Sequence, residues 1–292
     1  MKYFITACAC MNMLGRNPQE FIKNSSTDSL LIDCLKSYKF YDFDIIKHFF
    51  RLDISCQYIL EVVHQLKDTI EKYPSGTRIG IIVGASNGPV NVQKRFYESY
   101  ARGREASSIL FKMTPNSIYS GMIALIYGLH SYNTTIYTGS TAALDAINLS
   151  ISLLEAQWID AALVACVESR TEKFMPGAAA VLIDSCYRNS IGIEIIQGEQ
   201  VHLFTRKDVE KYLKGNDMVH SSDAILCDMQ SINMVNRIEV AEKKEIYCIE
   251  KRGKQYGAVC GLLQIMTLME TQYKKCFLLN GNDGQYTSLA VG

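Results

Sequence analysis

Two segments have a helical pattern but almost no charge, and they constrain the fold more than any other feature. In residues 140–156 the charged side chains are Asp145 and Glu155, and in residues 257–270 the first is Glu270. A helix that is apolar around its whole circumference has to be enclosed by protein. Each segment is followed by a short polar turn and an apolar strand, which predicts an internal duplication with the two helices packed back to back.

Apolar runs rich in β-branched residues alternate with helical patterns, which favours an α/β protein with a largely parallel sheet buried on both faces. Strands are expected at 2–8, 78–84, 134–138, 160–166, 179–184, 191–196, 223–228, 275–280 and 287–292. Helices are expected at about 57–73, 91–101, 117–129, 140–155, 207–214, 236–243 and 256–270, and loops at 24–29 and 214–223. The length suits a single domain, 1–292, with halves of about 1–187 and 188–292.

Composition excludes several classes of protein. With 48% hydrophobic and 21% charged residues, the chain can fill a large core and is not disordered. Its 30 Lys and Arg balance 30 Asp and Glu, so it lacks the positive excess that favours binding to nucleic acid or an anionic membrane. The apolar stretch 117–129 is shorter than the ~18–20 residues of a membrane span, and 3–14 is interpreted as a first strand rather than a signal peptide.

The ten cysteines are scattered and lie mostly inside apolar runs, as is typical of small core residues in a reduced, cytoplasmic protein. There is no C-x-x-C pair, and the five histidines do not cluster with cysteines at the spacing of zinc ligands. The glycine turn at 84–88 lacks both the G-x-G-x-x-G pattern and a Walker lysine. We therefore expect a cytoplasmic protein with no metal and no cofactor.

The order of motifs resembles the thiolase fold, and in particular the β-ketoacyl synthases of fatty acid and polyketide assembly. In the first half the resemblance is carried by 79–90, 114–129, 134–147, 159–169 and 176–185. In the second half it is carried by 228–239, 253–263 and 280–291. The resemblance implies duplicated βαβ halves in a layered α-β-α-β-α architecture, trimmed relative to the family.

The catalytic positions of that family are changed in this sequence. A ketosynthase needs a cysteine at the start of the first buried helix, where the helix dipole and unpaired N–H groups stabilise the thiolate, and two histidines in later loops. The resemblance puts Ser140, Asp228 and Lys254 at these three positions. It thus implies a catalytically inactive chain.

A chain of this kind resembles the chain-length factor, or ketosynthase beta subunit, of type II polyketide synthases. Residues 140–147 look like the factor's version of the segment, although such factors usually carry glutamine where this chain has Ser140. The resemblance implies a heterodimer with an active ketosynthase, an acyl carrier protein as a second partner, and control of polyketide length during decarboxylative condensation of malonyl units. Trimmed loops would leave apolar surface uncovered in a monomer, which favours an obligate heterodimer.

The resemblance also suggests roles for individual side chains. Met113, Ile118 and Met122 are candidates for the wall of a shared tunnel, with Ile118 and Met122 on one helix face, although methionines also fill ordinary cores. Glu168 and Glu239 match acidic positions that look structural, so each should be paired or hydrogen-bonded if buried.

Several alternatives remain at this stage. Ser140 is interpreted as a helix N-cap and Asp228 as an acceptor for loop N–H groups, but Ser140 could be a nucleophile with Asp228 or Lys254 as its catalytic partner. Lys251 and Arg252 either form an exposed charge cluster or help to dock an acidic carrier protein. Two rival functions are an active acyltransferase of the same fold, using Ser140 or a repositioned cysteine such as Cys166, and a scaffolding or small-molecule-binding homodimer.

Overall fold

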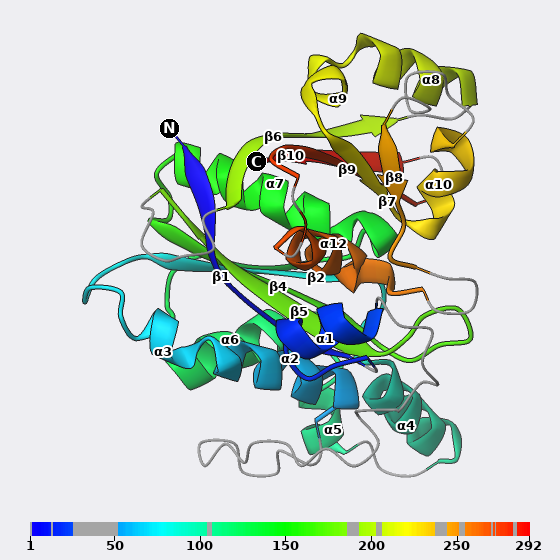
Figure 1. Ribbon diagram of the computed structural model, residues 1–292. Helices are drawn as coiled ribbons and strands as arrows, with labels where there is room; N and C mark the ends of the chain where they lie inside the picture. The colour runs from blue at the N-terminus through cyan, green and yellow to red at the C-terminus, as the bar shows by residue number, and fades with distance from the viewer. Residues whose placement is uncertain are drawn as a thin grey trace.

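A computed structural model gives the fold of the chain (Figure 1). It describes residues 2–12, 14–25, 52–103, 107–185, 193–202, 206–236, 244–250, 255–269, 271, 273–282 and 285–292. Within these residues ten strands form one mixed sheet in the order β3-β2-β4-β5-β1-β6-β10-β9-β7-β8. The predicted α/β class is confirmed.

The two halves of the sheet repeat the same topology. The first contains β1 (Tyr3–Asn12), β2 (Ile79–Ala85), β3 (Asn133–Ile136), β4 (Ala161–Glu168) and β5 (Gly177–Asp184). The second contains β6 (Ile193–His202), β7 (Ala224–Cys227), β8 (Glu245–Tyr247), β9 (Cys276–Asn282) and β10 (Gln285–Val291). In each half the strands lie in the order third, second, fourth, fifth, first, and β1 pairs with β6 to join the halves. This repetition confirms the predicted duplication.

The expectation of a largely parallel sheet is wrong for the middle of the sheet. The strand pairs β2–β3, β2–β4, β7–β8 and β7–β9 are parallel, whereas all the pairs between β4 and β9 are antiparallel. The connections explain the difference. β5 follows β4 and β10 follows β9 after short links, and such links join antiparallel strands, while parallel strands need a longer crossover.

The two uncharged segments form the predicted central helices. Turn η2 (Gly139–Thr141) leads into α7 (Ala142–Glu155), and turn η3 (Gly257–Val259) leads into α12 (Cys260–Leu268). Each turn begins with a glycine of positive φ, 66° at Gly139 and 51° at Gly257. The helices cross closely, because a Cβ added at Gly261 would lie 2.9 Å from the Ala143 Cβ atom. Figure 1 shows α7 and α12 between the two halves of the sheet.

Other helices cover the outer faces of the sheet and complete the α-β-α-β-α layers (Figure 1). Those of the first half are α2 (Ile54–Gln65), α3 (Lys67–Ile70) and α6 (Ile118–Tyr127), while α4 (Val90–Ala101) and α5 (Ser108–Lys112) pack against one another. Helix α1 (Pro18–Ser25) instead packs against β1 and α12, and its Phe21 belongs to the central core. Those of the second half are α8 (Arg206–Gly215), α9 (Asp217–Ser221) and α10 (Met229–Val235). Helix α2 packs on β1, β4 and β5, α6 packs on β2 and β3, and α10 packs on β7 and β9.

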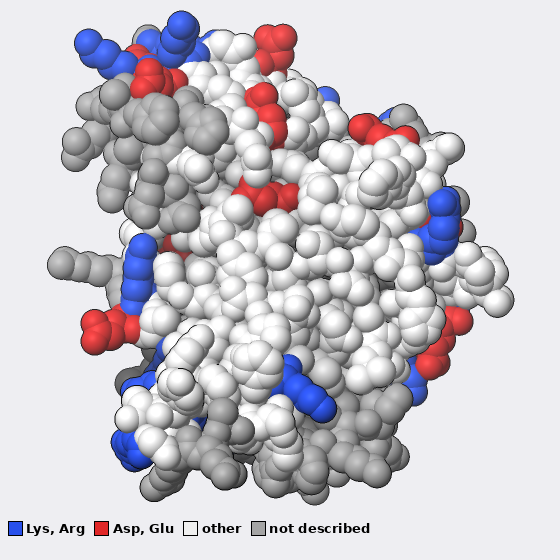
Figure 2. Space-filling view, turned by 180° about the vertical axis from the view of Figure 1, so that it is seen from behind, with Lys and Arg blue, Asp and Glu red and all other residues white. Residues whose placement is uncertain are grey.

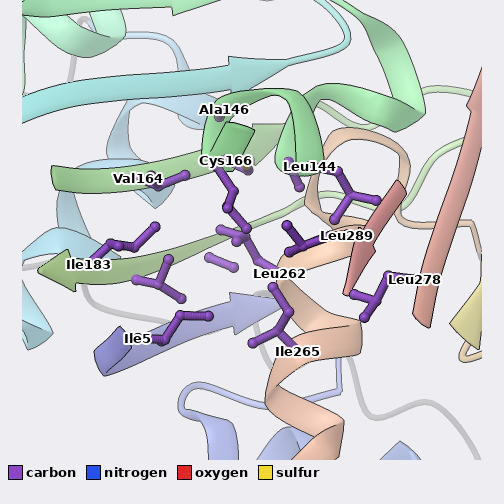
Figure 3. Close-up of a cluster of buried hydrophobic side chains, with 14 of the residues drawn as sticks. Ile5, Leu144, Ala146, Val164, Cys166, Ile183, Leu262, Ile265, Leu278 and Leu289 are labelled. Atoms are coloured by element: carbon purple, nitrogen blue, oxygen red, sulfur yellow. The ribbon is translucent and has the colours of Figure 1, made fainter. Parts of the chain in front are cut away.

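The central core joins side chains from both halves around the two buried helices. Figure 3 shows Ile5, Val164 and Ile183 from the first half of the sheet meeting Leu262 of α12 and Leu289 of β10. All five side chains are buried. The core therefore depends on both halves, since neither half could bury the helices by itself.

Several observed elements differ from the predicted ones. The expected loop 214–223 contains α9, whose N-cap Asn216 accepts a hydrogen bond from Met218 N (2.9 Å). Helix α10 starts at Met229, before the expected helix 236–243, most of which lies outside the described residues. Strand β8 has three residues and was not predicted. Among the helices of the described residues, none is long and apolar enough to cross a membrane.

Candidate functional site

The candidate site lies where the carboxyl ends of β4, β7 and β9 meet the two turns that precede the buried helices. Turn η2 contacts both η3 and β9, and η3 also contacts β4. Asp228 follows the last residue of β7, and Glu168 is the last residue of β4. The fold therefore brings polar side chains from both halves to one edge of the sheet.

Ser140 lies in the turn before α7 and is only 5% exposed. The N-cap of α7 is Thr141, so the interpretation of Ser140 as the cap is wrong. The physical reason is the 3-10 turn, which moves the start of the helix past Ser140. No hydrogen bond joins Ser140 Oγ to another residue in the described part of the chain, so nothing there activates this hydroxyl as a nucleophile.

Asp145, in the first turn of α7, connects the two halves. Its carboxylate accepts hydrogen bonds from Thr141 Oγ1 (2.7 Å), Gln200 Nε2 (2.7 Å) and Thr287 Oγ1. Thr141 lies beside the helix, whereas Gln200 and Thr287 belong to β6 and β10 of the second half. This buried carboxylate thus fixes the start of α7 against the opposite half of the sheet.

Asp228 is buried and caps α10. Its Oδ1 accepts from Ser231 N (2.8 Å) and its Oδ2 from Gly281 N (3.0 Å), so the carboxylate ties the start of α10 to the end of β9. Burial raises the pKa of Asp228 to about 6, and the nearby Glu250 adds to the shift, while the hydrogen bonds oppose it. The geometry matches the simpler of the two interpretations, an acceptor for loop N–H groups.

Glu168 is fully buried and crosses from the first half to the second. Its Oε2 accepts from Ala258 N (3.0 Å) in η3, and its Oε1 accepts from Asn87 Nδ2 (3.4 Å). Burial raises the pKa of this carboxyl, and its hydrogen bonds act in the opposite direction. A Cβ added at Gly257 would lie within 2.1 Å of Glu168 Oε2, so only glycine fits beside it.

Glu250 was missed by the reasoning from sequence. It is buried, and it accepts from Met229 N (2.7 Å) at the start of α10 and from Tyr256 N (2.5 Å) just before η3. Burial raises its pKa. The one signal in the sequence was a single acidic residue directly after the apolar run 246–249, and that pattern is too common to single out a site.

Several buried polar atoms at this edge have no hydrogen-bond partner among the described residues: Ser169 Oγ, Ser231 Oγ and both amide atoms of Asn280. Asn280 pairs in register with Thr287, the residue that bonds Asp145. Buried polar groups are usually satisfied by ordered water or by a ligand. The edge thus has the polar lining of a binding site but no identified nucleophile.

The remaining predicted residues lie elsewhere. Met113, Ile118 and Met122 are half-buried and pack against the same apolar cluster in the outer layer of the first half, on the face of the sheet opposite α7. Ser140 does not belong to this cluster. The other four predicted residues lie outside the described residues: Glu239, Lys251, Arg252 and Lys254.

Thiols and imidazoles do not supply the missing chemistry in the described part of the chain. Cys166 is fully buried in β4, and burial raises its pKa far above the ordinary range, which disfavours a reactive thiolate. The described histidine side chains, His64, His130 and His220, belong to α2, to the segment after α6 and to α9. No group of three His, Cys, Asp or Glu side chains that could hold a metal ion occurs among the described residues.

Comparison with protein families and solved structures gives the same fold. Residues 42–179 match the family "Beta-ketoacyl synthase, N-terminal domain". No curated protein sequence matches the chain significantly.

Three solved structures illustrate the similarity. The ishigamide ketosynthase/chain length factor is 12% identical, with a TM-score of 0.78 over 100% of this chain and 99% of that chain. A complex of AntDE with AntF, a type II polyketide synthase acyl-carrier protein with its ketosynthase bound to the hexaketide, is 12% identical, with a TM-score of 0.77 over 100% and 99%. The ketosynthase ApeO with its chain length factor ApeC, from Xenorhabdus doucetiae, is 13% identical, with a TM-score of 0.72 over 100% and 98%. The chain therefore has the thiolase-like fold of the ketosynthases, and its residues 42–179 match the N-terminal domain of the β-ketoacyl synthases.

Proposed function

We propose that this chain is a non-catalytic chain-length-factor subunit, which pairs with an active ketosynthase and helps to set the length of a polyketide chain carried by an acyl carrier protein. The observation that carries the proposal is the state of Ser140. By resemblance it matches the position of the family's nucleophile, but it is buried and makes no hydrogen bond to a general base among the described residues. A serine hydroxyl without such a base is a weak nucleophile.

The second changed position supports the same proposal. Both oxygens of Asp228 accept backbone hydrogen bonds, so this side chain holds the loop together where a ketosynthase would have a histidine. A residue committed in this way is poorly placed to polarise a substrate carbonyl. The position that by resemblance matches a catalytic histidine thus has a structural role in this chain.

The surface supports pairing with a second chain. Strand β3 is an edge strand whose residues are all at least partly exposed, and an edge strand presents unpaired N–H and C=O groups. Large apolar side chains are also exposed on the first half of the chain, including Phe111 (59%), Leu125 (57%) and Trp158 (63%). Figure 2 shows a wide central area with few charged side chains on the side of the molecule opposite to the view of Figure 1. An apolar edge of this kind fits a stable subunit interface.

Co-expression with a ketosynthase encoded beside this chain tests the pairing. The proposal predicts that the two chains co-purify as a 1:1 complex. If this chain is soluble by itself as a homodimer and does not co-purify with the ketosynthase, the alternative of a scaffolding or ligand-binding homodimer replaces the heterodimer.

Intact-mass analysis after incubation with acyl-carrier thioesters tests the absence of catalysis. The proposal predicts no acyl adduct on this chain. Stoichiometric acylation that is lost in Ser140→Ala would show an active acyltransferase instead. A Cys166→Ala variant is the matched control, because an adduct lost there would identify the rival thiol nucleophile.

The proposed role in chain length rests on Met113, Ile118 and Met122. Because Met122 is half-buried beside Ile118 on α6, a larger side chain there should narrow a tunnel at the subunit interface. Met122→Trp should therefore shorten the product without abolishing condensation. An unchanged product spectrum from an intact complex would contradict the assignment of the tunnel.

The docking of a carrier protein is proposed for Lys251 and Arg252 by resemblance alone. Replacing both with Glu should weaken binding of an acidic carrier protein to the complex, most strongly at low salt, because exposed charges act mainly on the rate of association. Replacing the exposed Lys94 and Arg95 of α4 with Glu gives a control with the same change in net charge. Equal losses in the two variants would contradict a specific role for Lys251 and Arg252.

A further inference from the structure

Two buried carboxylates, those of Asp228 and Glu250, accept hydrogen bonds at the start of α10, beside the candidate site. Asp228 caps α10 and bonds Ser231 N and Gly281 N, while Glu250 bonds Met229 N, the next residue along the chain. Both side chains are at most 5% exposed. The amides that they hold at the start of α10, Met229 N and Ser231 N, are two residues apart, and the charge of Glu250 acts on Asp228. Like charges that are neighbours and removed from water repel.

The pair fastens three separate elements. Asp228 joins the start of α10 to the end of β9, and Glu250 joins the start of α10 to the backbone at Tyr256 and Gly257, where η3 and α12 begin. From the other half, Glu168 bonds Ala258 N in the same turn. The junction between β7, β9 and α12 therefore depends on carboxylates accepting backbone hydrogen bonds.

The groups that face the pair do not neutralise it within the described residues. The titratable neighbours are thiols and phenols, and burial raises the pKa of each of them: Cys227, Cys248, Tyr256, Cys260 and Tyr286. Lys173 reaches α10, but its Nζ donates to the Gln230 side chain (3.1 Å). Neither Asp228 nor Glu250 takes part in a salt bridge in the described part of the chain.

We propose that Asp228 and Glu250 form a pH-sensitive latch, which holds the starts of α10 and α12 against the end of β9 when the pair carries no more than one negative charge and loosens when it carries two. With one proton bound, the ionised carboxylate accepts strong hydrogen bonds and the neutral one accepts through its carbonyl oxygen. When the second proton leaves, both hydrogen-bond sets remain possible, but the two charges repel in a region of low dielectric constant.

The direction of the effect follows from linkage. The folded chain holds a proton on the pair more tightly than the unfolded chain does, so the latch is most stable at low pH and weakens as the pH rises through the folded pKa of the pair. The pKa of Asp228, at about 6, places this change near neutral pH. Opening would expose the turn before α12 and the end of β9, which border the candidate site.

Amide hydrogen exchange of the whole chain at pH 5 and pH 8, expressed as protection factors corrected for intrinsic rates, tests the latch. Protection should fall about tenfold to 100-fold between pH 5 and pH 8 at Met229, Ser231, Tyr256 and Gly281. This range corresponds to a difference of about one to two units between the pKa of the pair in the folded and in the unfolded chain. Protection at Ile81 should not change, because its amide donates to the backbone carbonyl oxygen of Tyr132 (2.7 Å) and not to a carboxylate.

The variant Glu250→Gln separates a charge effect from a general loss of stability. It keeps the size of the side chain and leaves the pair with no more than one negative charge, so protection of Ser231 and Gly281, whose amides donate to Asp228, should no longer fall between pH 5 and pH 8. Equal protection of these two amides at pH 5 and pH 8 in the unmodified chain would overturn the latch. A fall in Glu250→Gln as large as that in the unmodified chain would overturn the coupling of the two carboxylates.

Discussion

The contact between Gly257 and Glu168 gives the most specific prediction about stability. Gly257 has a φ of 51°, and a Cβ there would lie 2.1 Å from Glu168 Oε2 and 3.1 Å from Phe174 Cδ1. Gly257→Ala would therefore combine a left-handed backbone, which costs about 1–2 kcal/mol for alanine, with displacement of a buried carboxyl from its hydrogen bonds, which costs about 1.5–3 kcal/mol. We expect a total loss of about 2.5–5 kcal/mol in the free energy of unfolding.

Gly128→Ala is the matched control, because Gly128 has a φ of 62° and nothing lies within 4 Å of its added Cβ. It should lose only the backbone part, about 1–2 kcal/mol. Urea unfolding of both variants at one pH, followed by circular dichroism, measures the difference. In Glu168→Ala/Gly257→Ala the loss should be smaller than the sum of the two single losses, since the clash is gone. Equal losses for Gly257→Ala and Gly128→Ala would refute the packing described for η3.

Three further predictions follow from burial and charge. The free energy of unfolding should fall by about 2–3 kcal/mol from pH 4 to pH 8, because burial raises the pKa of Asp228 from 3.8 to about 6. The stability that the protonated carboxyl contributes is complete below pH 3.8 and is lost as the pH rises past 6. Urea unfolding across this range measures the change, and a rise in the free energy of unfolding would contradict the prediction. A thiol reagent should modify the half-buried Cys8 and Cys248 before the fully buried Cys166 and Cys260, as peptide mass spectrometry can establish, and early labelling of Cys166 would contradict its burial. Trp158, the single tryptophan, is 63% exposed, so its fluorescence should be quenched readily by acrylamide in the isolated chain; protection from the quencher would show that Trp158 is covered.

The central architecture could be predicted from the sequence because it depends on gross charge patterning. Residues 140–156 and 257–270 carry so few charges that they had to be enclosed, and the strands that follow them recur at the same spacing. Whether neighbouring strands run parallel or antiparallel was harder to predict from the sequence. The pairing directions depend on the length of the connections, such as the two residues between β9 and β10, rather than on the apolar pattern of the strands.

The details of the site depend on contacts between residues far apart in the chain. Glu168 and Glu250 differ by 82 positions, yet both bond backbone N–H groups of the turn before α12. No local pattern marks Glu250, because a single acidic residue after an apolar run also occurs on many surfaces. The 3-10 turn that moves Ser140 off the helix cap is likewise set by the packing of η2 against η3 and β9.

Intact-mass analysis of the co-purified complex, after incubation with an acylated carrier protein, tests the central claim most directly. The account predicts a 1:1 complex in which the ketosynthase gains the mass of the acyl group and this chain keeps its unmodified mass. An acyl adduct on this chain that disappears in Ser140→Ala would contradict the account, because it would show that the buried serine is a working nucleophile.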